Sequence, residues 1–459
     1  MLDIDLIKKE LKENFDVKHR IMNLDGNDIH IIFIDNMCDS KFISQNIMNP
    51  IINYNQCIAD TDTLKKRVLY ANNIDDIDNE AKAIEHILSG DVIIILSNTK
   101  QGIFCEAKGF AKRSIAIPET EAVLQGPREG FNESITDNIS MIRRRIKNDR
   151  LKLESYTLGK KSNTMVIFCY LDGTAPDRLI NYVRNTLNNI NNDFILDTAA
   201  IEEALVHHKS LFDLTGRSEK PDVVASKIME GRIAVLVDGT PNVLTAPYFF
   251  VENFQTPDDY YINKYYASMS RLIRWGAFFI ATLLTGFYIA ITTYHFSLIP
   301  TVFVFRLAVS RSGVPFPTSV EVLLMFLFFQ LIKEAGIRLP QPIGQAMSIV
   351  GALILGDAAT GAGITSQTTV LVVSLSSICY FLVPKLYGAI TFWSLVLVFM
   401  ASINGLPGYF VGFFLMVTQI SSLESCQYNY LFPMGTFRKF KYRDVIFRDD
   451  LRNISKKVL

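Results

Sequence analysis

The stretch at residues 386–423 reads LYGAITFWSLVLVFMASINGLPGYFVGFFLMVTQISSL and contains no charged residue. A single straight α-helix of this length would overshoot the roughly 30 Å hydrocarbon layer of a bilayer. Asn404, Gly405 and Pro407 lie near its middle, and such residues favour a break in a helix. The stretch therefore predicts a helical hairpin inside a membrane.

Charged residues are scarce in the rest of the C-terminal half as well. Residues 275–305 include none, and residues 339–384 include only Asp357. A membrane-spanning helix needs roughly 20 mainly apolar residues, because peptide groups cannot stay unpaired in lipid. We therefore predict an all-α polytopic membrane domain over residues 263–424, followed by a basic cytosolic tail at residues 425–459.

The number of membrane crossings depends on one segment, residues 320–335. It gives six crossings if it spans the bilayer and four if it lies in the interface. Its charged residues are tolerated chiefly against other helices or water, so we regard them as interface candidates: Glu321, Lys333 and Glu334. With six crossings, the basic loops and both chain termini fall on the cytoplasmic side, in agreement with the positive-inside rule.

Residues 343–364 are rich in glycine and alanine, a composition that lets helices approach each other closely. Sparse polar groups on such a helix can line a water-filled path. The pore-lining candidates are Gln345, Ser348, Gly351 and Asp357. Asp357 is the first choice for a polar role because it is ionisable and lies within a membrane segment. Packing within one chain would use the same glycines equally well.

The N-terminal half carries dense, mixed charges and contains a duplication. An apolar strand followed by an acidic turn occurs at residues 30–35 and again at residues 165–172. A helix that runs through glycine into a β-branched strand occurs at residues 87–95 and again at residues 228–236. The nearly equal offsets predict two related α/β subdomains.

We place the two subdomains at residues 1–120 and 155–262, with a linker at residues 121–154. Isoleucines at helical spacing in the linker alternate with basic residues, which predicts a basic amphipathic helix. Such a helix either packs its apolar stripe on the subdomains or contacts another subunit or the membrane surface. The interface candidates on it are Arg143, Arg144 and Arg145.

Overall charge and motif content exclude several classes of function. Lys and Arg number 46 and Asp and Glu number 46, so no whole-chain charge favours nucleic acid. Six scattered cysteines form no CxxC pair, and His207 and His208 have no further ligand nearby in sequence. We therefore expect no enzyme activity, no cofactor and no metal. The first twenty residues are too polar for a secretory signal, which predicts a cytosolic N-terminal half.

Seven stretches of this chain, in a fixed order, resemble one protein family. They are IPETE at 117–121, GPREGF at 126–131, NISMIRRRI at 138–146, EGRIAVLVDG at 230–239, DDYY at 258–261, KEAGIRLP at 333–340 and GQAMSIVG at 344–351. The set is similar to the A subunits of GerA-type spore nutrient germination receptors, and the resemblance covers almost the whole chain. Two stretches depart from the family pattern, RSEKPD at residues 217–222 and FFQ at residues 328–330.

The resemblance implies an integral protein of the spore inner membrane that works with two partners. These are a transporter-like B subunit, which binds the nutrient, and a lipoprotein C subunit. It also implies a ring of A subunits around an ion pathway, so that nutrient binding starts ion release and germination. We therefore predict a homo-oligomeric, nutrient-gated channel subunit in contact with membrane lipid. The alternatives are a secondary transporter and a non-conducting scaffold for partner subunits.

Overall fold

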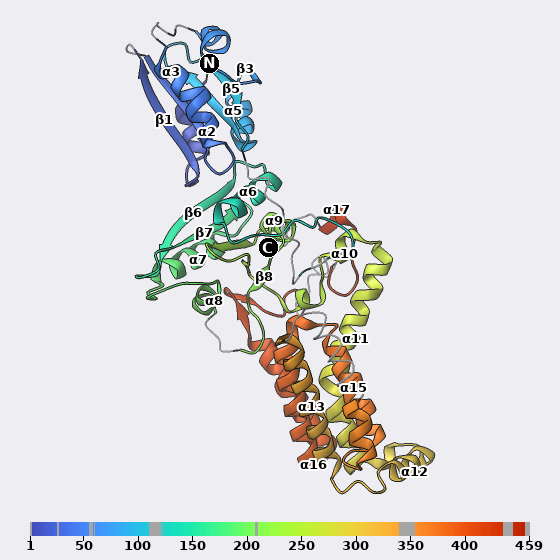
Figure 1. The fold of residues 1–459 in the computed structure, drawn as a ribbon. Coiled ribbons are helices and arrows are strands. Elements are labelled where there is room, and N and C mark those ends of the chain that lie inside the picture. Colours follow the sequence, from blue (N-terminus) through green and yellow to red (C-terminus); the bar gives the residue numbers. More distant parts are fainter. Residues whose placement is uncertain are drawn as a thin grey trace.

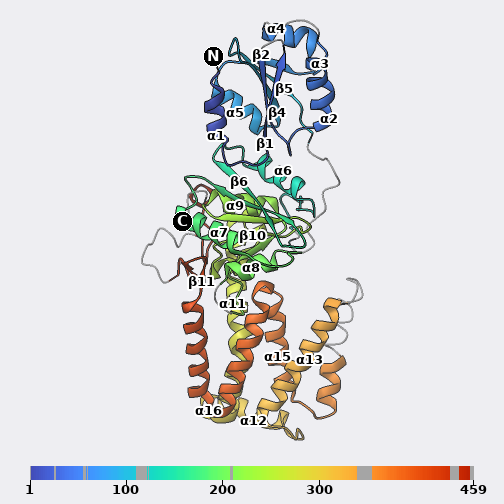
Figure 2. The same ribbon diagram turned by 90° about the vertical axis from the view of Figure 1, so that its left-hand side faces the viewer.

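Two α/β subdomains and a helical bundle follow one another along the molecule in the computed structural model (Figure 1, Figure 2). This architecture confirms the predicted fold class, in which a duplicated α/β region precedes an all-helical region. The structure describes the following residues: 2–24, 27–54, 58, 60–109, 121, 123–206, 210–338, 354–434 and 444–454.

Each subdomain is built on a five-stranded antiparallel sheet, and the two sheets share one strand order. The order is β1-β2-β4-β5-β3 in the first sheet and β6-β7-β9-β10-β8 in the second. The first sheet contains β1 (Val17–Leu24), β2 (Asn27–Ile34), β3 (Ile74–Ile77), β4 (Asp91–Leu96) and β5 (Gly102–Glu106). The second contains β6 (Leu151–Leu158), β7 (Thr164–Leu171), β8 (Gly216–Ser218), β9 (Ile233–Val237) and β10 (Val243–Ala246). The duplication is therefore present in the topology.

Helices cover both faces of the first sheet, which explains why its central strand is apolar throughout. Every residue of β4 is buried. Because side chains alternate along a strand, Val92 and Ile94 pack on one face, and Ile93 and Ile95 on the other. One face is covered by α1 (Ile4–Glu10) and α5 (Glu80–Leu88). The other is covered by α2 (Ser40–Phe42), η1 (Ile43–Met48), α3 (Asn49–Ile52) and η2 (Leu64–Val68), the last of which directly follows α4 (Thr61–Thr63).

The second sheet is covered in the same way. One face packs on α7 (Asp177–Asn189) and α8 (Ala199–Leu205), and the other packs on α6 (Ile135–Arg145) and α9 (Pro221–Met229). The amphipathic helix of the sequence prediction is α6, and its residues Ile139 and Ile142 lie in the core with α9. Strand β6 begins inside the segment 121–154, and α6, in the same segment, packs on the second sheet. Both elements are therefore part of the second subdomain's packing.

A buried ion pair joins the two subdomains. Arg143 of α6 donates from Nε to Oδ2 of Asp16 at 2.6 Å and from Nη2 to Oδ1 at 2.7 Å, and its side chain is 1% exposed. Nη2 also donates to Oδ1 of Asn14 at 3.1 Å. Nearby, Lys152 of β6 donates to the carbonyl of Glu10 at 2.8 Å. The second subdomain therefore holds the segment between α1 and β1 of the first.

The bundle extends away from the second subdomain (Figure 1). Among the described residues, two helices are long and apolar enough to cross a membrane, Lys264–Tyr294 and Pro384–Ser422, and two apolar helices are shorter, Thr301–Ser310 and Gln367–Tyr380. The bundle elements are α11 (Lys264–Ile289), η4 (Ala290–Tyr294), η5 (Phe296–Leu298), α12 (Thr301–Ser310), α13 (Thr318–Arg338), a helix described over residues 354–361, α15 (Gln367–Tyr380), η6 (Pro384–Leu386) and α16 (Tyr387–Ser422).

Helix α16 is the predicted helical hairpin. Its backbone breaks at Asn404, with φ −136° and ψ 18°, and at Gly405, with φ 61° and ψ −136°. The positive φ at Gly405 lies where side chains are strained, which explains the glycine. The two arms are antiparallel, because Nε1 of Trp393 in the first arm donates to Oε1 of Gln419 in the second at 3.0 Å. The hairpin is therefore confirmed.

We predict that Arg143→Gln lowers the stability of the full-length chain in detergent. Breaking a buried ion pair from one side leaves an uncompensated charge, which typically costs about 3 to 5 kcal/mol. The measurement is the unfolding midpoint, with Arg144→Gln as the matched control because Arg144 is half-buried and pairs with Glu129. Equal midpoints for the two variants would contradict the role given to Arg143.

Candidate functional site at the junction of the two halves

An aromatic core connects the second subdomain to the first helix of the bundle. The chain leaves β10 through η3 (Phe250–Phe254) and α10 (Asp258–Tyr261) before α11 begins. Phe254 stacks on Trp275 of α11 with ring centroids 3.7 Å apart, and Phe250 contacts Phe278 edge to face at 5.6 Å. Tyr430, which follows the bundle, is fully buried in the same core. The two halves therefore share one hydrophobic core.

A buried network of charges lies at the start of α11. Arg271 and Arg274 are three residues apart, so they point from one face of the helix. Both reach Asp259 of α10: Nε of Arg271 lies 3.2 Å from Oδ2, and Nη2 of Arg274 lies 2.5 Å from Oδ1. Arg271 also donates to Oδ1 of Asp444 at 2.7 Å. Because Asp444 follows the whole bundle in sequence, this network ties the first and last parts of the membrane half together.

A second network holds η3 against the sheet. Glu252 is 4% exposed, and its Oε2 accepts from Nζ of Lys227 at 2.6 Å. Its Oε1 accepts from Arg232 and from the backbone N–H of Phe249, the latter at 2.9 Å. Burial alone would raise the pKa of Glu252, but the adjacent Arg232 and Lys227 more than offset it and lower the pKa to about 2. The carboxylate therefore stays ionised and fixes the turn that leads to α11.

A cavity of about 350 Å³ lies beside these two networks. Its lining combines residues of the second subdomain with Tyr260 and Tyr261 of α10 and with Lys385 from the bundle. Nζ of Lys385 lies 3.9 Å from Oε1 of Glu121. The junction therefore brings together groups from the second subdomain, from α10 and from the bundle.

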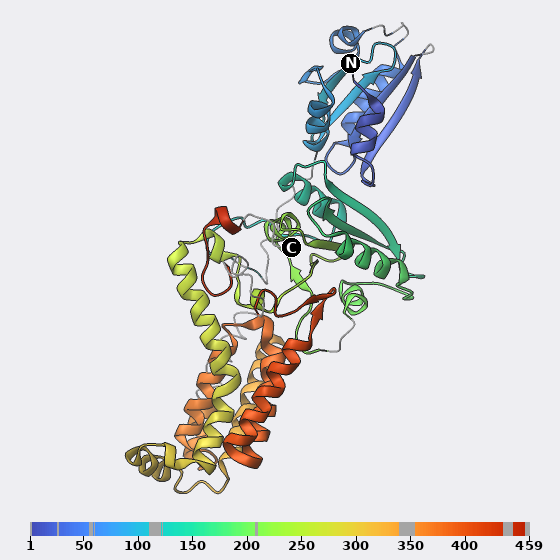
Figure 3. The same ribbon diagram turned by 180° about the vertical axis from the view of Figure 1, so that it is seen from behind.

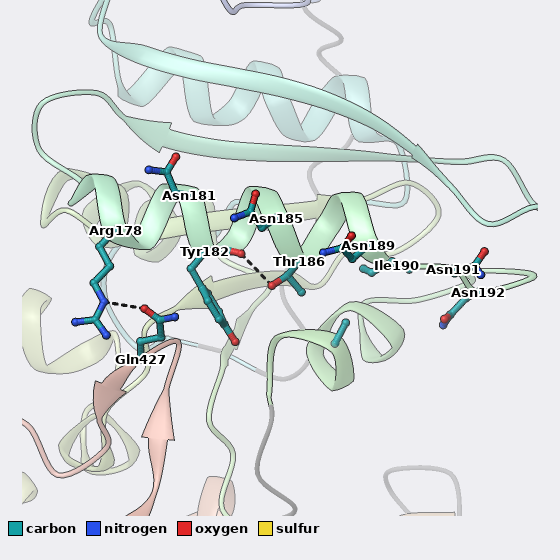
Figure 4. Close-up of a pocket in the computed structure, with 11 residues that line it drawn as sticks. Arg178, Asn181, Tyr182, Asn185, Thr186, Asn189, Ile190, Asn191, Asn192 and Gln427 are labelled. Carbon is teal, nitrogen blue, oxygen red and sulfur yellow. Dashed lines mark hydrogen bonds between the residues drawn. The ribbon is translucent and has the colours of Figure 1, made fainter.

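Another hollow, of about 640 Å³, lies along α7 (Figure 4). Amide side chains dominate its lining, and Nε of Arg178 donates to Oε1 of Gln427 at 2.7 Å, which connects α7 to the β11–β12 hairpin (Glu424–Ser425 and Tyr428–Asn429). The described lining contains no carboxylate, histidine or cysteine. Its hydroxyl groups belong to Tyr182, which donates to the carbonyl of Leu205 at 2.8 Å, and to Thr186, which donates to the carbonyl of Tyr182 at 2.9 Å.

The structure places the three arginines of the predicted interface within this chain. Arg143 is enclosed between the two subdomains, and Arg144 and Arg145 both pair with Glu129. The structure therefore accounts for all three with intramolecular partners. Whether α6 also meets another subunit stays a prediction.

The predicted bundle residues lie in different surroundings. Glu321 is fully buried, and Nζ of Lys333 lies over the ring of Tyr387. Glu334 is exposed and accepts from Arg338 at 2.5 Å. Asp357 is exposed on the helix described over residues 354–361. The other pore candidates lie outside the described residues: Gln345, Ser348 and Gly351.

The described residues provide no cluster of three or more potential metal ligands. The five described cysteines are free and buried, and burial raises the pKa of the Cys38 and Cys105 thiols to about 12. Such thiols are not reactive thiolates. Cys57, His207 and His208 lie outside the described residues.

The junction is the part of the site that the sequence analysis missed. Arg271 and Arg274 stand at the entrance of the first span, and Asp259 belongs to the DDYY stretch, so both partners are visible in the sequence. Nothing in the sequence indicates that they pair. Asp444 gives no local signal at all, because its partner lies 173 residues away.

Comparison with known proteins gives one consistent result. A family model described as "Bacillus/Clostridium GerA spore germination protein" matches residues 5–458. The chain is 34% identical over 450 residues to spore germination protein KA of Bacillus subtilis (strain 168), covering 96% of this chain and 82% of that protein. It is 36% identical over 355 residues to spore germination protein GerLA of Bacillus cereus, covering 77% of this chain and 72% of that protein.

A solved structure is similar to the N-terminal part of this chain. It is the crystal structure of the N-terminal domain of the A subunit of the Bacillus megaterium spore germinant receptor GerK3. The sequence identity is 27% and the TM-score is 0.40, and the alignment covers 54% of this chain and 94% of that chain.

We predict that stability falls as the pH drops from 4.5 toward 2 and that Glu252→Gln flattens this part of the profile. A carboxylate whose pKa is lower in the folded state stabilises the fold above its unfolded-state pKa, and this contribution is lost as the pH falls through the folded-state pKa. For Glu252 the contribution is on the order of 3 kcal/mol. The measurement is the unfolding midpoint of the full-length chain in detergent against pH. Glu203→Gln, at an exposed position of α8, is the control and keeps the wild-type slope.

Proposed function

The chain belongs to the GerA family, the A subunits of spore germination receptors, and on this premise we propose that it forms a homo-oligomeric, nutrient-gated ion channel. The channel would lie in the spore inner membrane with both chain termini in the cytoplasm. A transporter-like B subunit would supply nutrient binding, and a lipoprotein C subunit would complete the receptor. The proposal assigns no enzymatic step and no cofactor to this chain.

The observation that supports an oligomer is the open surface of small residues around Asp357. A side-chain carbon built at Gly361 would meet nothing within 4 Å among the described residues, and one at Gly356 would make only an ordinary contact of 3.6 Å with Val370. Packing against the described residues therefore gives Gly361 no reason to be glycine. Small residues on membrane helices allow other helices to approach closely, which favours a neighbouring subunit at this surface.

The position of Asp357 supports conduction. In a cyclic oligomer, every subunit would place this exposed carboxylate at the same height, and rings of Asp or Glu attract cations to the mouths of cation channels. Gln345, Ser348 and Gly351 precede it on the same predicted helix and would continue the lining. Lys333 and Glu334 stay candidates for contacts between subunits.

The junction supports gating by the soluble half. Because α10 and α11 are joined through Asp259, Arg271 and Arg274, a rotation of the second subdomain would move the first bundle helix with it. The C-terminal segment would move as well, since Asp444 belongs to the same network. This connection fits a receptor whose extramembrane parts control a membrane pathway.

We predict that Gly361→Leu disrupts assembly. A leucine would separate helices that approach at this surface, so the mass of the purified full-length chain in detergent should fall from that of an oligomer to that of a monomer. Gly388→Leu tests whether the effect is specific to the helix of Asp357, because Gly388 is equally open among the described residues but lies on α16. An oligomer that survives Gly361→Leu would remove this surface from the interface.

We predict that Asp357→Asn lowers the nutrient-evoked cation current through the receptor reconstituted with its B and C subunits. Losing a ring of charge at a channel mouth reduces the local cation concentration, and a several-fold lower conductance is expected. Glu203→Gln, outside the bundle, should leave the current unchanged. Absence of current in the wild-type chain would favour the scaffold, and saturable solute exchange without current would favour the transporter.

A further inference from the structure

Helix α12 lies at the end of the bundle far from the soluble half and extends to one side of the other helices (Figure 1). Glu321, in the first turn of α13, is fully buried. Its Oε2 accepts from the backbone N–H of Ser366 at 2.9 Å and from Oγ1 of Thr369 at 3.1 Å. Oγ1 of Thr365 lies 3.4 Å from the same oxygen. One carboxylate oxygen, Oε2, therefore accepts hydrogen bonds from residues at the start of α15.

The other oxygen of Glu321 is different. Its Oε1 is buried and has no hydrogen-bond partner among the described residues. Nε of Arg311, on the turn after α12, lies 3.5 Å away and is also without a hydrogen bond. By contrast, Nε of Arg143 lies 2.6 Å from its carboxylate. Arg311 therefore supplies opposite charge nearby without making a hydrogen bond to Glu321.

Two hydroxyl groups of the same end share this condition. Oγ of Ser310, next to Arg311, and Oγ1 of Thr318, one turn before Glu321, are buried without partners among the described residues. Buried polar atoms in proteins are nearly always hydrogen-bonded, so several such atoms from two adjoining elements point to a ligand. At this end of the bundle the atoms without a hydrogen bond are one carboxylate oxygen, two hydroxyl oxygens and Nε of the Arg311 guanidinium.

These groups define the class of ligand. Carboxylate and hydroxyl oxygens are hard ligands that suit cations of the first two main groups. A calcium site takes six to eight oxygens, generally with several carboxylates. This one offers a single carboxylate, whose one negative charge balances one positive charge. A monovalent metal cation is therefore the chemical class that fits.

We propose that Oε1 of Glu321 binds a monovalent metal cation, such as potassium or sodium, in competition with the guanidinium of Arg311. Oγ1 of Thr318 and Oγ of Ser310 are the further ligands offered by this end of the bundle. Arg311 stands on a turn and its side chain is 28% exposed, so it can move toward solvent when a cation takes its place. The contacts of Oε2 with α15 are unaffected by the exchange.

The site links cation binding to the position of α12. With Arg311 at Glu321, the turn after α12 is held against α13. With a cation at Glu321, that charge contact is gone, and α12 is released from it. The exchange requires one chain only, so the proposal stands apart from oligomerisation and conduction.

The experiment compares unfolding midpoints of the full-length chain in detergent at equal ionic strength in potassium chloride, sodium chloride and choline chloride. The methyl groups of choline keep oxygen ligands from coordinating its charge directly, so the metal salts should raise the wild-type midpoint by roughly 2 °C or more relative to choline chloride. Glu321→Gln should abolish the difference between salts. Arg311→Gln should enlarge it, because the competing cation is removed. For each variant, the midpoint in choline chloride is subtracted from the midpoint in the metal salt. This subtraction removes the effect of the substitution on stability itself.

Two further samples keep the result decisive. Glu334→Gln removes an exposed carboxylate from the same helix and should keep the wild-type difference. If Glu321→Gln does not fold, Thr318→Val should reduce the difference by removing one ligand. The proposal is overturned if Arg311→Gln shows no larger difference than the wild type, or if the difference persists in Glu321→Gln. A further wild-type sample in calcium chloride at the same ionic strength tests the class of cation, and a shift in the midpoint seen only with calcium would overturn the monovalent class.

Discussion

The pairing of Arg271 and Arg274 with Asp259 is the interaction on which the arrangement of the two halves depends. A long apolar helix gains nothing from a particular angle to a soluble domain, since lipid solvates its sides equally well in many orientations. Buried guanidinium groups remove this freedom, because each has to reach a carboxylate in one geometry. Asp259 stands on α10, directly after the turn held by Glu252. The sheet therefore sets the direction of α11, and the other helices of the bundle pack around it.

The duplicated subdomains have one topology but different tasks. The first contacts the second subdomain through residues between Glu10 and Asp16. The second contacts the first subdomain through α6 and β6, and the bundle through η3 and α10. The same fold thus serves as a peripheral module in one copy and as a connecting module in the other. The two copies differ in the side chains that make these outside contacts. In the second subdomain these include the buried Arg143 of α6 and the buried Glu252 of η3.

The sequence predicts the features that depend on local patterns. The break in α16 follows from Asn404 and Gly405, and the repeated strand order follows from the repeated helix–glycine–strand pattern. The pairings that build the sites could not be predicted in this way. Glu321 meets Ser366 and Thr369 only because the residues between them fold back along the bundle, and a single sequence contains no signal for such distant contacts. The amphipathic pattern of α6 is visible, but the sheet face that it covers becomes known only from the fold.

The hairpin in α16 has a consequence for how the chain is made. Its second arm returns toward the second subdomain, as the view from behind shows (Figure 3). Tyr430 and Asp444, which follow this arm in the sequence, contact residues of the junction. Until the last helix has entered the membrane, Phe250 and Arg271 lack partners that arrive only with the final residues. The soluble subdomains emerge from the ribosome first. Their contacts with the bundle at the junction, however, can be completed only when synthesis is almost finished. Assembly of the junction is thus a late step in biogenesis, and a chain that stops short of the hairpin's second arm would expose an incomplete core to quality control.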